Sequence, residues 1–214
     1  MDNSQTYLVV EFRRDIARIL SSEAFDIFNN IIARHGEPQR RYHGISHLTA
    51  LLDLLAKHAP HLEAGSAPRL ALWWHDAIYD PTAKDNEERS AELARDHLKR
   101  LGAPTELIEE TAAIILMTKN HWAGGSAGDG DYFLDADIAI LGAPPDTYDA
   151  YAAGVRQEYS WVPDEAFCAG RSAFLTSALT WPRLFRTDTF ETAYAAQARA
   201  NMQRERTMLT GSPP

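Results

Sequence analysis

The chain has 214 residues, of which 45% are hydrophobic and 24% are charged, and its formal net charge is −9. This composition provides enough apolar side chains for a folded core and excludes a largely disordered chain. The acidic balance, without a cluster of lysines and arginines, argues against binding of a nucleic-acid polymer through a basic face.

Cysteine usage and the N-terminal segment indicate the compartment. Cys168 is the only cysteine, so the sequence provides neither a disulfide framework nor a cysteine-based zinc site. The first residues, MDNSQTYLVVEFRRD, lack the basic start and the apolar core of a signal peptide. No apolar run approaches the roughly 18 residues that a membrane span needs. We therefore expect a cytoplasmic protein without a membrane partner.

Apolar residues recur at helical spacing from the first elements onward. Only residues 6–12, TYLVVEF, could form a strand instead of a helix, and the sequence offers no partner strand for them. The first predicted helices cover residues 22–36, which end at a capping Gly36, residues 44–59, and residues 68–80, which stop before Pro81.

The helical pattern continues to the C-terminus. Residues 85–102 have acidic residues in the first turn and basic residues in the last before Gly102, the order that a helix dipole favours. After a further helix at 104–121, the glycine-rich stretch 123–131 predicts a loop, which we interpret as a mobile lid. The remaining predicted helices cover residues 132–141, 145–160, 163–180 and 188–208. The chain is therefore predicted to be one all-α domain.

Ionisable residues occur where the helical pattern predicts a core. His75 and Asp76 lie side by side in ALWWHDAIYD, residues 71–80, while His47 and Asp137 share helical faces with leucines. A buried imidazole or carboxylate is costly without a strong partner. Two imidazoles and two carboxylates suit an intermediate divalent cation, so Mn²⁺, Co²⁺, Ni²⁺ or Fe²⁺ is favoured over Mg²⁺, which prefers oxygen.

The ordered set SHLTALL, WWHDAIY and LDADIAIL resembles the HD-domain superfamily of metal-dependent phosphohydrolases. With RRYHGISHL, DNEERSAELA, TKNHW, VRQEYSWV and ARANMQRE, the sequence looks like a bacterial subgroup of predicted metal-dependent HD phosphohydrolases. The resemblance covers roughly residues 38–205. It implies an HD-type helical bundle over residues 1–214, with a core at about 38–145 and C-terminal helices at about 145–208 packed on it.

The resemblance also implies the metal ligands. His47 matches the first ligand of the family pattern, and His75 and Asp76 match the adjacent pair. The last ligand matches Asp137, with Asp135 as a competitor two residues away on a different helical face.

Three residues are candidates for proton transfer. His43, one turn before His47, is a proton donor, a second metal ligand, or a helix-start residue bonded to the backbone. Glu88 is a candidate base or acceptor near the metal, although an acidic residue in a first helical turn also needs no functional reason. Asp80 is a further candidate, and a capping role at Pro81 explains it equally well.

A phosphorylated substrate needs cationic or polar partners. The candidates for substrate binding are Arg40, Lys119, His121 and Arg156. For arginines on helices with an apolar stripe, including Arg171, the competing interpretation is buried pairing with Glu158 or Glu205. His97 is predicted to lie on a solvated face.

The predicted function is therefore metal-assisted hydrolysis of a phosphoester, most simply a nucleotide, as a small anionic substrate. One alternative is an HD-fold di-iron oxygenase, in which His43 or His121 would complete a second metal site. Another is a non-catalytic nucleotide-binding module. Many HD proteins form dimers, so a homodimer is compatible with the resemblance.

Overall fold

A computed structural model describes residues 3–17 and 23–211 of the chain. These residues form α-helices and short 3₁₀ segments with no strand between them, which confirms the predicted all-α class. The stretch TYLVVEF lies within helix α1 (Asn3–Asp15) rather than in a strand. None of the described helices combines the length and the apolar character needed to cross a lipid bilayer.

The chain divides into two compact units, Met1–Leu134 and Asp135–Pro214. The first contains α1, α2 (Ala24–His35), α3 (Ile45–His58), α4 (Ala67–Trp74), α5 (Asn86–Leu101), α6 (Thr105–Met117) and η1 (Thr118–Asn120). Helix α7 (Gly130–Ile138) begins in the first unit and ends in the second. The second also contains η2 (Ala139–Gly142), α8 (Pro145–Glu158), α9 (Asp164–Leu179) and α10 (Asp188–Thr210). The expected single HD-type domain stays a prediction.

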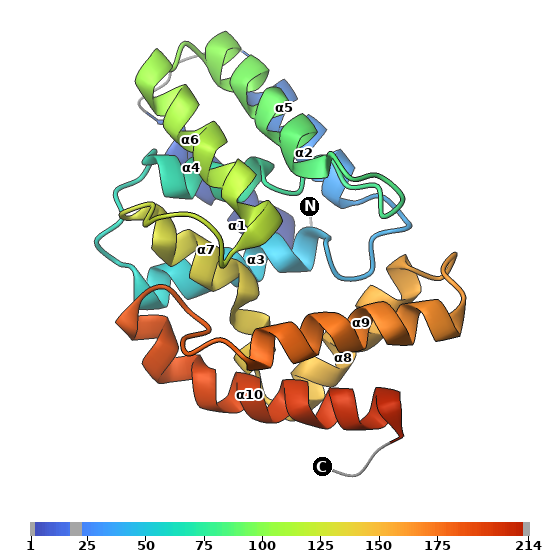
Figure 1. Cartoon of the computed structure of the whole chain (residues 1–214). Helices are drawn as coiled ribbons and strands as arrows, with labels where there is room; N and C mark the ends of the chain where they lie inside the picture. The colour runs from blue at the N-terminus through green and yellow to red at the C-terminus, as the bar shows by residue number, and fades with distance from the viewer. Residues whose placement is uncertain (1–2, 18–22, 212–214) are drawn as a thin grey trace. The chain divides into compact units, whose positions relative to one another are not determined.

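Helix α4 forms the centre of the first unit. All of its residues are buried, and it packs on α5 and α6, which lie side by side (Figure 1). Trp73 meets Phe12 of α1 edge-on at 5.1 Å between ring centroids. The Trp73 indole N–H donates to Asp15, which also accepts two hydrogen bonds from Arg69. The polar atoms that accompany this apolar packing therefore have partners, as burial requires.

The helix predicted over residues 68–80 ends much earlier than the sequence pattern indicated. Helix α4 stops at Trp74, and His75 and Asp76 lie in the turn that follows it. The guanidinium of Arg40 donates to the backbone oxygens of Asp76 and Ala77, at 2.5 and 3.2 Å. A buried side chain thus binds two carbonyl groups that a continuing helix would pair with its own N–H groups.

Helix α5 matches its predicted ends. Gly102 follows it with φ 83°, a left-handed conformation that favours glycine, and its N–H bonds back to Lys99. The prediction for His97 on this helix was wrong, because the side chain is buried and accepts a hydrogen bond from the Trp74 indole at 3.0 Å. Burial lowers the pKa of His97, which keeps the imidazole neutral as an acceptor.

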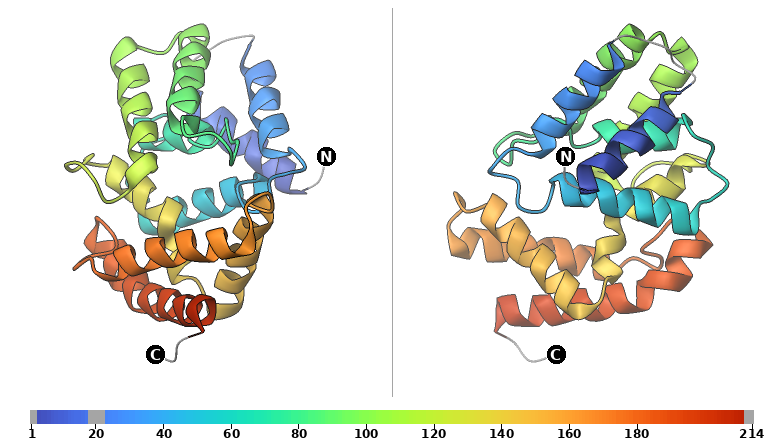
Figure 2. Two further views of the ribbon diagram at one scale, coloured as in Figure 1. Left: turned by 45° about the vertical axis from the view of Figure 1, so that its right-hand side comes forward. Right: turned by 180° about the vertical axis from the view of Figure 1, so that it is seen from behind.

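The second unit is held together by α10. Figures 1 and 2 show α9 and α10 side by side, and α10 also packs on η2. Asn201 of α10 donates from its amide to the backbone oxygens of Leu141 and Ala143. Arg171 of α9 donates twice to Glu205 of α10, so the predicted buried pairing is confirmed for this arginine.

Candidate metal centre

The two candidate histidines come from the ends of two helices. His47 lies in the first turn of α3 and is 5% exposed, and His75 directly follows α4 and is 1% exposed. Glycine precedes α3 at its N-cap, where Gly44 has extended backbone angles. Two imidazoles are therefore held in the interior by rigid elements.

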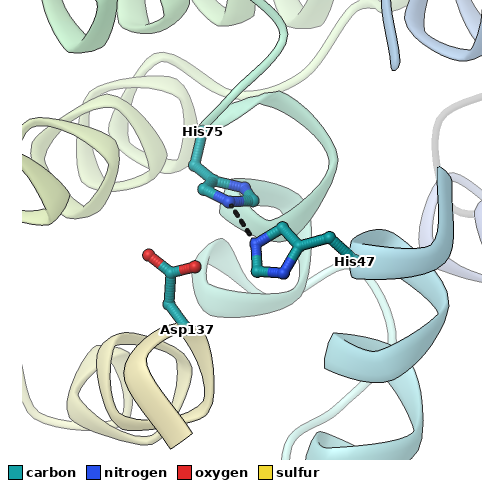
Figure 3. Close-up of side chains that lie close together, drawn as sticks. All are labelled: His47, His75 and Asp137. Carbon is teal, nitrogen blue, oxygen red and sulfur yellow. Dashed lines mark hydrogen bonds between the residues drawn. The ribbon is translucent and has the colours of Figure 1, made fainter. Parts of the chain in front are cut away.

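The orientation of His75 is fixed by the backbone. Its Nδ1 lies 3.0 Å from the carbonyl oxygen of Leu72, so Nδ1 carries the proton and donates it there. In the neutral ring the lone pair then lies on Nε2, which is 3.2 Å from Nε2 of His47. Figure 3 shows the two rings facing one another with this contact between them. Such a second bond to a carbonyl is the usual way in which proteins orient a ligating histidine.

Asp76 brings a carboxylate to the same point. Its Oδ2 lies 3.1 Å from Nε2 of His75 and 3.9 Å from Nε2 of His47. Atoms that carry lone pairs repel one another at these distances unless a proton or a cation lies between them. The convergence of the three side chains is therefore the expected arrangement for binding a positive charge.

Asp137 completes a group with the two histidines. One ligand atom from each of His47, His75 and Asp137 lies within 4.8 Å of the others. Figure 3 shows the Asp137 carboxylate directed toward both imidazoles. Asp137 is on α7, the helix that begins at Gly130 in the first unit. Asp137 therefore belongs to the same group of potential ligand atoms as the two histidines.

Asp135, the competing candidate, has other partners. Its carboxylate accepts hydrogen bonds from the backbone N–H groups of Arg186 and Thr187, at 2.7 and 2.8 Å, and from the Thr187 hydroxyl. The Thr187 side chain in turn accepts from the N–H of Phe190 at the start of α10. Asp135 thus organises the entry to α10, and the group of three ligand atoms contains Asp137 instead.

The spacing of the donors fits a divalent transition metal. Two nitrogen ligands about 2.1 Å from one cation, at angles of about 90–110°, lie about 3.0–3.4 Å apart. The observed separation of 3.2 Å between the two Nε2 atoms falls in this range. Imidazole nitrogens with carboxylate oxygens suit such ions.

His43 lies beside the cluster on the loop before α3. Its ring stacks on Tyr79 with 4.3 Å between centroids and lies 6.1 Å from the ring of His47. Tyr42 contacts both imidazoles, at 4.8 Å from His43 and 5.0 Å from His47. Aromatic packing thus holds the His43 ring beside the His47 ring, and its predicted role in proton transfer stays a prediction.

Arg40 is buried, and its guanidinium bonds to the protein itself. Besides Asp76 and Ala77, it donates to the backbone oxygen of His43 and to the carboxylate of Glu37. Its side chain is 1% exposed. These contacts connect the loop before α3 to the turn that carries Asp76. Arg40 therefore positions the candidate site, and its predicted role in substrate binding stays a prediction.

Two other predicted residues pair with each other on the surface. The Lys119 ammonium donates to Glu88 at 2.5 Å and to the backbone oxygen of Lys84. This ion pair lowers the pKa of Glu88, so the carboxylate is less basic than an ordinary glutamate. Asp80 accepts two hydrogen bonds from Thr82, as in a side-chain-stabilised turn.

The remaining candidates for substrate binding lie apart in the sequence and differ in their contacts. Arg156, in the second unit, donates to the backbone oxygens of Tyr159 and Val162 and to Asp164. His121 follows η1 in the first unit, and its ring contacts Trp122 at 6.1 Å. Neither residue belongs to the group of three ligand atoms.

The sequence interpretation missed one buried histidine. His35 ends α2 and is 2% exposed; its Nδ1 donates to the backbone oxygen of Ile31 at 3.0 Å. Its buried Nε2 has no hydrogen-bond partner among the described residues. Burial lowers the pKa of His35 to about 3. Its spacing of four residues from Ile31, on the apolar face of the helix, was the signal that could have revealed it.

No family model matches the chain, and neither the curated proteins nor the solved structures include a match. The functional interpretation therefore rests on the residues themselves, and above all on the group formed by His47, His75 and Asp137.

Proposed function

We propose that the chain is a metal-dependent phosphohydrolase of the HD superfamily that hydrolyses a phosphoester, with nucleotides as the substrate class. One observation carries this proposal: two buried imidazoles with Nε2 atoms 3.2 Å apart share a group of ligand atoms with Asp137. The order of His47, the adjacent His75 and Asp76, and the distal Asp137 along the sequence supports the assignment to this superfamily.

The ligand residues define what the site can do. His47, His75 and Asp137 would hold the cation, and Asp76 would add a carboxylate oxygen from the turn after α4. A divalent cation in such a site offsets the charge of a phosphate and makes water more acidic. The carbonyl oxygen of Leu72 keeps the His75 ring in the orientation that directs Nε2 into the site.

His43 is the residue we assign to proton transfer. It lies one turn before His47, and its stacking on Tyr79 fixes the plane of its ring. An imidazole can act as a general acid and give a proton to the leaving oxygen of a phosphoester. The contact of Arg40 with the His43 backbone oxygen ties this loop to the turn of Asp76.

The nature of the donors favours Mn²⁺, Co²⁺, Ni²⁺ or Fe²⁺ as the metal. Imidazole is a good ligand for these ions, whereas Mg²⁺ prefers oxygen ligands and keeps several waters. The net charge of −9 repels a free phosphate ester at long range. A local cation would offset this repulsion, so we expect little activity without metal.

A phosphatase screen tests the proposal. Metal-free protein is incubated with nucleoside mono-, di- and triphosphates and cyclic nucleotides, each with Mn²⁺, Co²⁺, Ni²⁺, Fe²⁺ or Mg²⁺. We expect metal-dependent hydrolysis, followed by chromatography of the nucleoside and nucleotide products, that Asp76→Ala reduces by at least about 100-fold, because ligand loss removes the charge that stabilises the transition state. Asp96→Ala serves as the matched control, since this exposed carboxylate of α5 pairs with Arg100 and is not in the group of potential ligand residues.

Equal turnover in wild type and Asp76→Ala would refute the proposal. Absence of turnover with every metal, together with tight binding of a nucleotide, would favour a non-catalytic module. Turnover that requires iron and consumes oxygen would favour an oxygenase.

A further inference from the structure

A polar concavity of about 260 Å³ lies next to the turn that follows Asp76. Its walls come from the end of α2, the loop after it, the turn at residues 77–81 and the first half of α5. Both helices place an arginine in the wall, Arg34 from α2 and Arg89 from α5. The concavity thus collects two guanidinium groups from separate elements of the first unit.

The guanidinium of Arg34 has free donor capacity. Its Nε donates to the side-chain oxygen of Asn30 at 2.8 Å, and its terminal nitrogens have no hydrogen-bond partner among the described residues. Arg89 makes one distant ion contact, 3.9 Å from Nη1 to Asp85. Arg89 is half exposed, and Asp85 does not line the concavity. Both side chains can therefore donate to a ligand without breaking a strong internal bond.

The acidic residues of the concavity do not cancel this charge. Glu37 accepts hydrogen bonds from Arg40 and Gln39 on one oxygen, so the buried Arg40 guanidinium neutralises it. Asp80 is the other acidic residue in the wall, and its Oδ1 accepts two hydrogen bonds from Thr82. Arg89 interacts electrostatically with Asp80, so the concavity retains the charge of about one guanidinium that no carboxylate in its wall offsets.

We propose that this concavity, defined by Arg34, Arg89 and Gln39, binds a phosphate group. Planar guanidinium groups match phosphate oxygens with paired hydrogen bonds, and two of them in one polar recess provide both charge and geometry. Tyr79 lines the same concavity and stacks on His43, so a bound phosphate would lie near the loop that carries His43. The site is distinct from the His47, His75 and Asp137 group and does not require a metal.

Titration of metal-free protein with inorganic phosphate tests the proposal independently of catalysis. Protein kept in a chelator is titrated calorimetrically at low ionic strength, so that a bound cation cannot account for phosphate binding. We expect saturable binding in the millimolar range or tighter. Each of Arg34→Gln and Arg89→Gln should weaken it about tenfold, the usual effect of losing a charged hydrogen bond at a partly exposed site.

The matched control is Arg95→Gln, which removes a guanidinium from the same helix α5 but outside the concavity. It should leave phosphate affinity within twofold of wild type. Lack of saturable binding up to about 20 mM phosphate, or equal binding by the double variant Arg34→Gln/Arg89→Gln, would overturn the proposal. Either result would leave the metal-dependent phosphohydrolase activity to be judged separately by the phosphatase screen.

The phosphate could belong to the substrate or to a separate anionic effector. Repeating the titration on Mn²⁺-loaded protein with a nucleoside diphosphate separates these sources. If one molecule reaches both sites, Arg34→Gln weakens nucleotide binding as strongly as it weakens phosphate binding. If the concavity takes a separate anion, Arg34→Gln leaves the nucleotide affinity unchanged while it weakens phosphate binding, and both outcomes retain the phosphate site.

Discussion

Lowering the pH from 7 to 5 is expected to remove about 2 kcal/mol of folding free energy through His35 alone. This histidine is 2% exposed, and burial lowers its pKa from the ordinary 6.5 to about 3. Its Nδ1–H donates to Ile31, while the buried Nε2 has no hydrogen-bond partner among the described residues. The folded protein therefore keeps the His35 ring neutral over most of the pH range between about 3 and 6.5.

The direction of the effect follows from proton binding. Below pH 6.5 the unfolded chain protonates His35, whereas the folded protein does so only near pH 3. The unfolded state thus binds more protons, so stability is fully present above about 6.5 and falls as the pH decreases. The linkage relation gives about 2 kcal/mol between pH 7 and pH 5, and about 5 kcal/mol in total once the pH is below both values.

Urea unfolding at pH 7, 6 and 5, in the presence of a chelator, measures this contribution. The variant His35→Phe keeps an aromatic ring of similar size and cannot titrate, so its stability should decline about 2 kcal/mol less than that of wild type over the interval. The exposed His61 provides the control, and His61→Gln should follow wild type. Parallel pH curves for wild type and His35→Phe would refute the reasoning.

Three substitutions test individual buried contacts by urea unfolding. Arg40→Ala should lower the free energy of unfolding by about 3 kcal/mol, because three backbone oxygens lose a buried donor. The more exposed Arg95→Ala should lower it by less than about 1 kcal/mol, and an equally small effect for Arg40→Ala would contradict this role. Gly142→Ala should lower the free energy of unfolding by about 1–3 kcal/mol, since the added Cβ would lie 2.6 Å from the backbone oxygen of Tyr194. At Gly170 an added Cβ would lie in open space, so Gly170→Ala should be neutral or stabilising. Tyr148→Phe should cost about 1–2 kcal/mol by removing the buried hydroxyl that donates to Glu205, and no measurable loss would count against that bond.

Helical periodicity was sufficient to predict most of the fold. The apolar stripe and the terminal charges of α5, followed by Gly102, are local signals that act within one helix, and the structure confirms both. The end of α4 could not be predicted in this way. Its sequence continues to favour a helix, whereas the backbone oxygens of the turn beyond it are bound by Arg40, which is 36 residues distant from Asp76 along the chain.

The same distinction applies to the candidate site. The sequence identified His47, His75 and Asp137 because ionisable residues on apolar faces are unusual and because their order matches a known pattern. Periodicity placed Asp137 on the face of the neighbouring leucines, but it could not show that Asp135 bonds to the backbone N–H groups of residues 186 and 187. Long-range hydrogen bonds of this kind have no signature within a helix.

The buried state of His97 illustrates a further limit. Its neighbours in ARDHLKR are polar, which favours a solvated interpretation. The structure instead places His97 beside the Trp74 indole, whose N–H needs an acceptor in the core. A buried donor on one helix thus determines the environment of a histidine on another.

Binding of Mn²⁺ to metal-free protein, measured by calorimetry, tests the central claim most directly. We expect one cation per chain in wild type and at least about 100-fold weaker binding in His47→Ala, because one of the converging ligand atoms is lost. The exposed His61→Ala should bind as wild type does. Failure of wild type to bind Mn²⁺, Co²⁺, Ni²⁺ or Fe²⁺, or unchanged binding in His47→Ala, would contradict a metal centre at His47, His75 and Asp137.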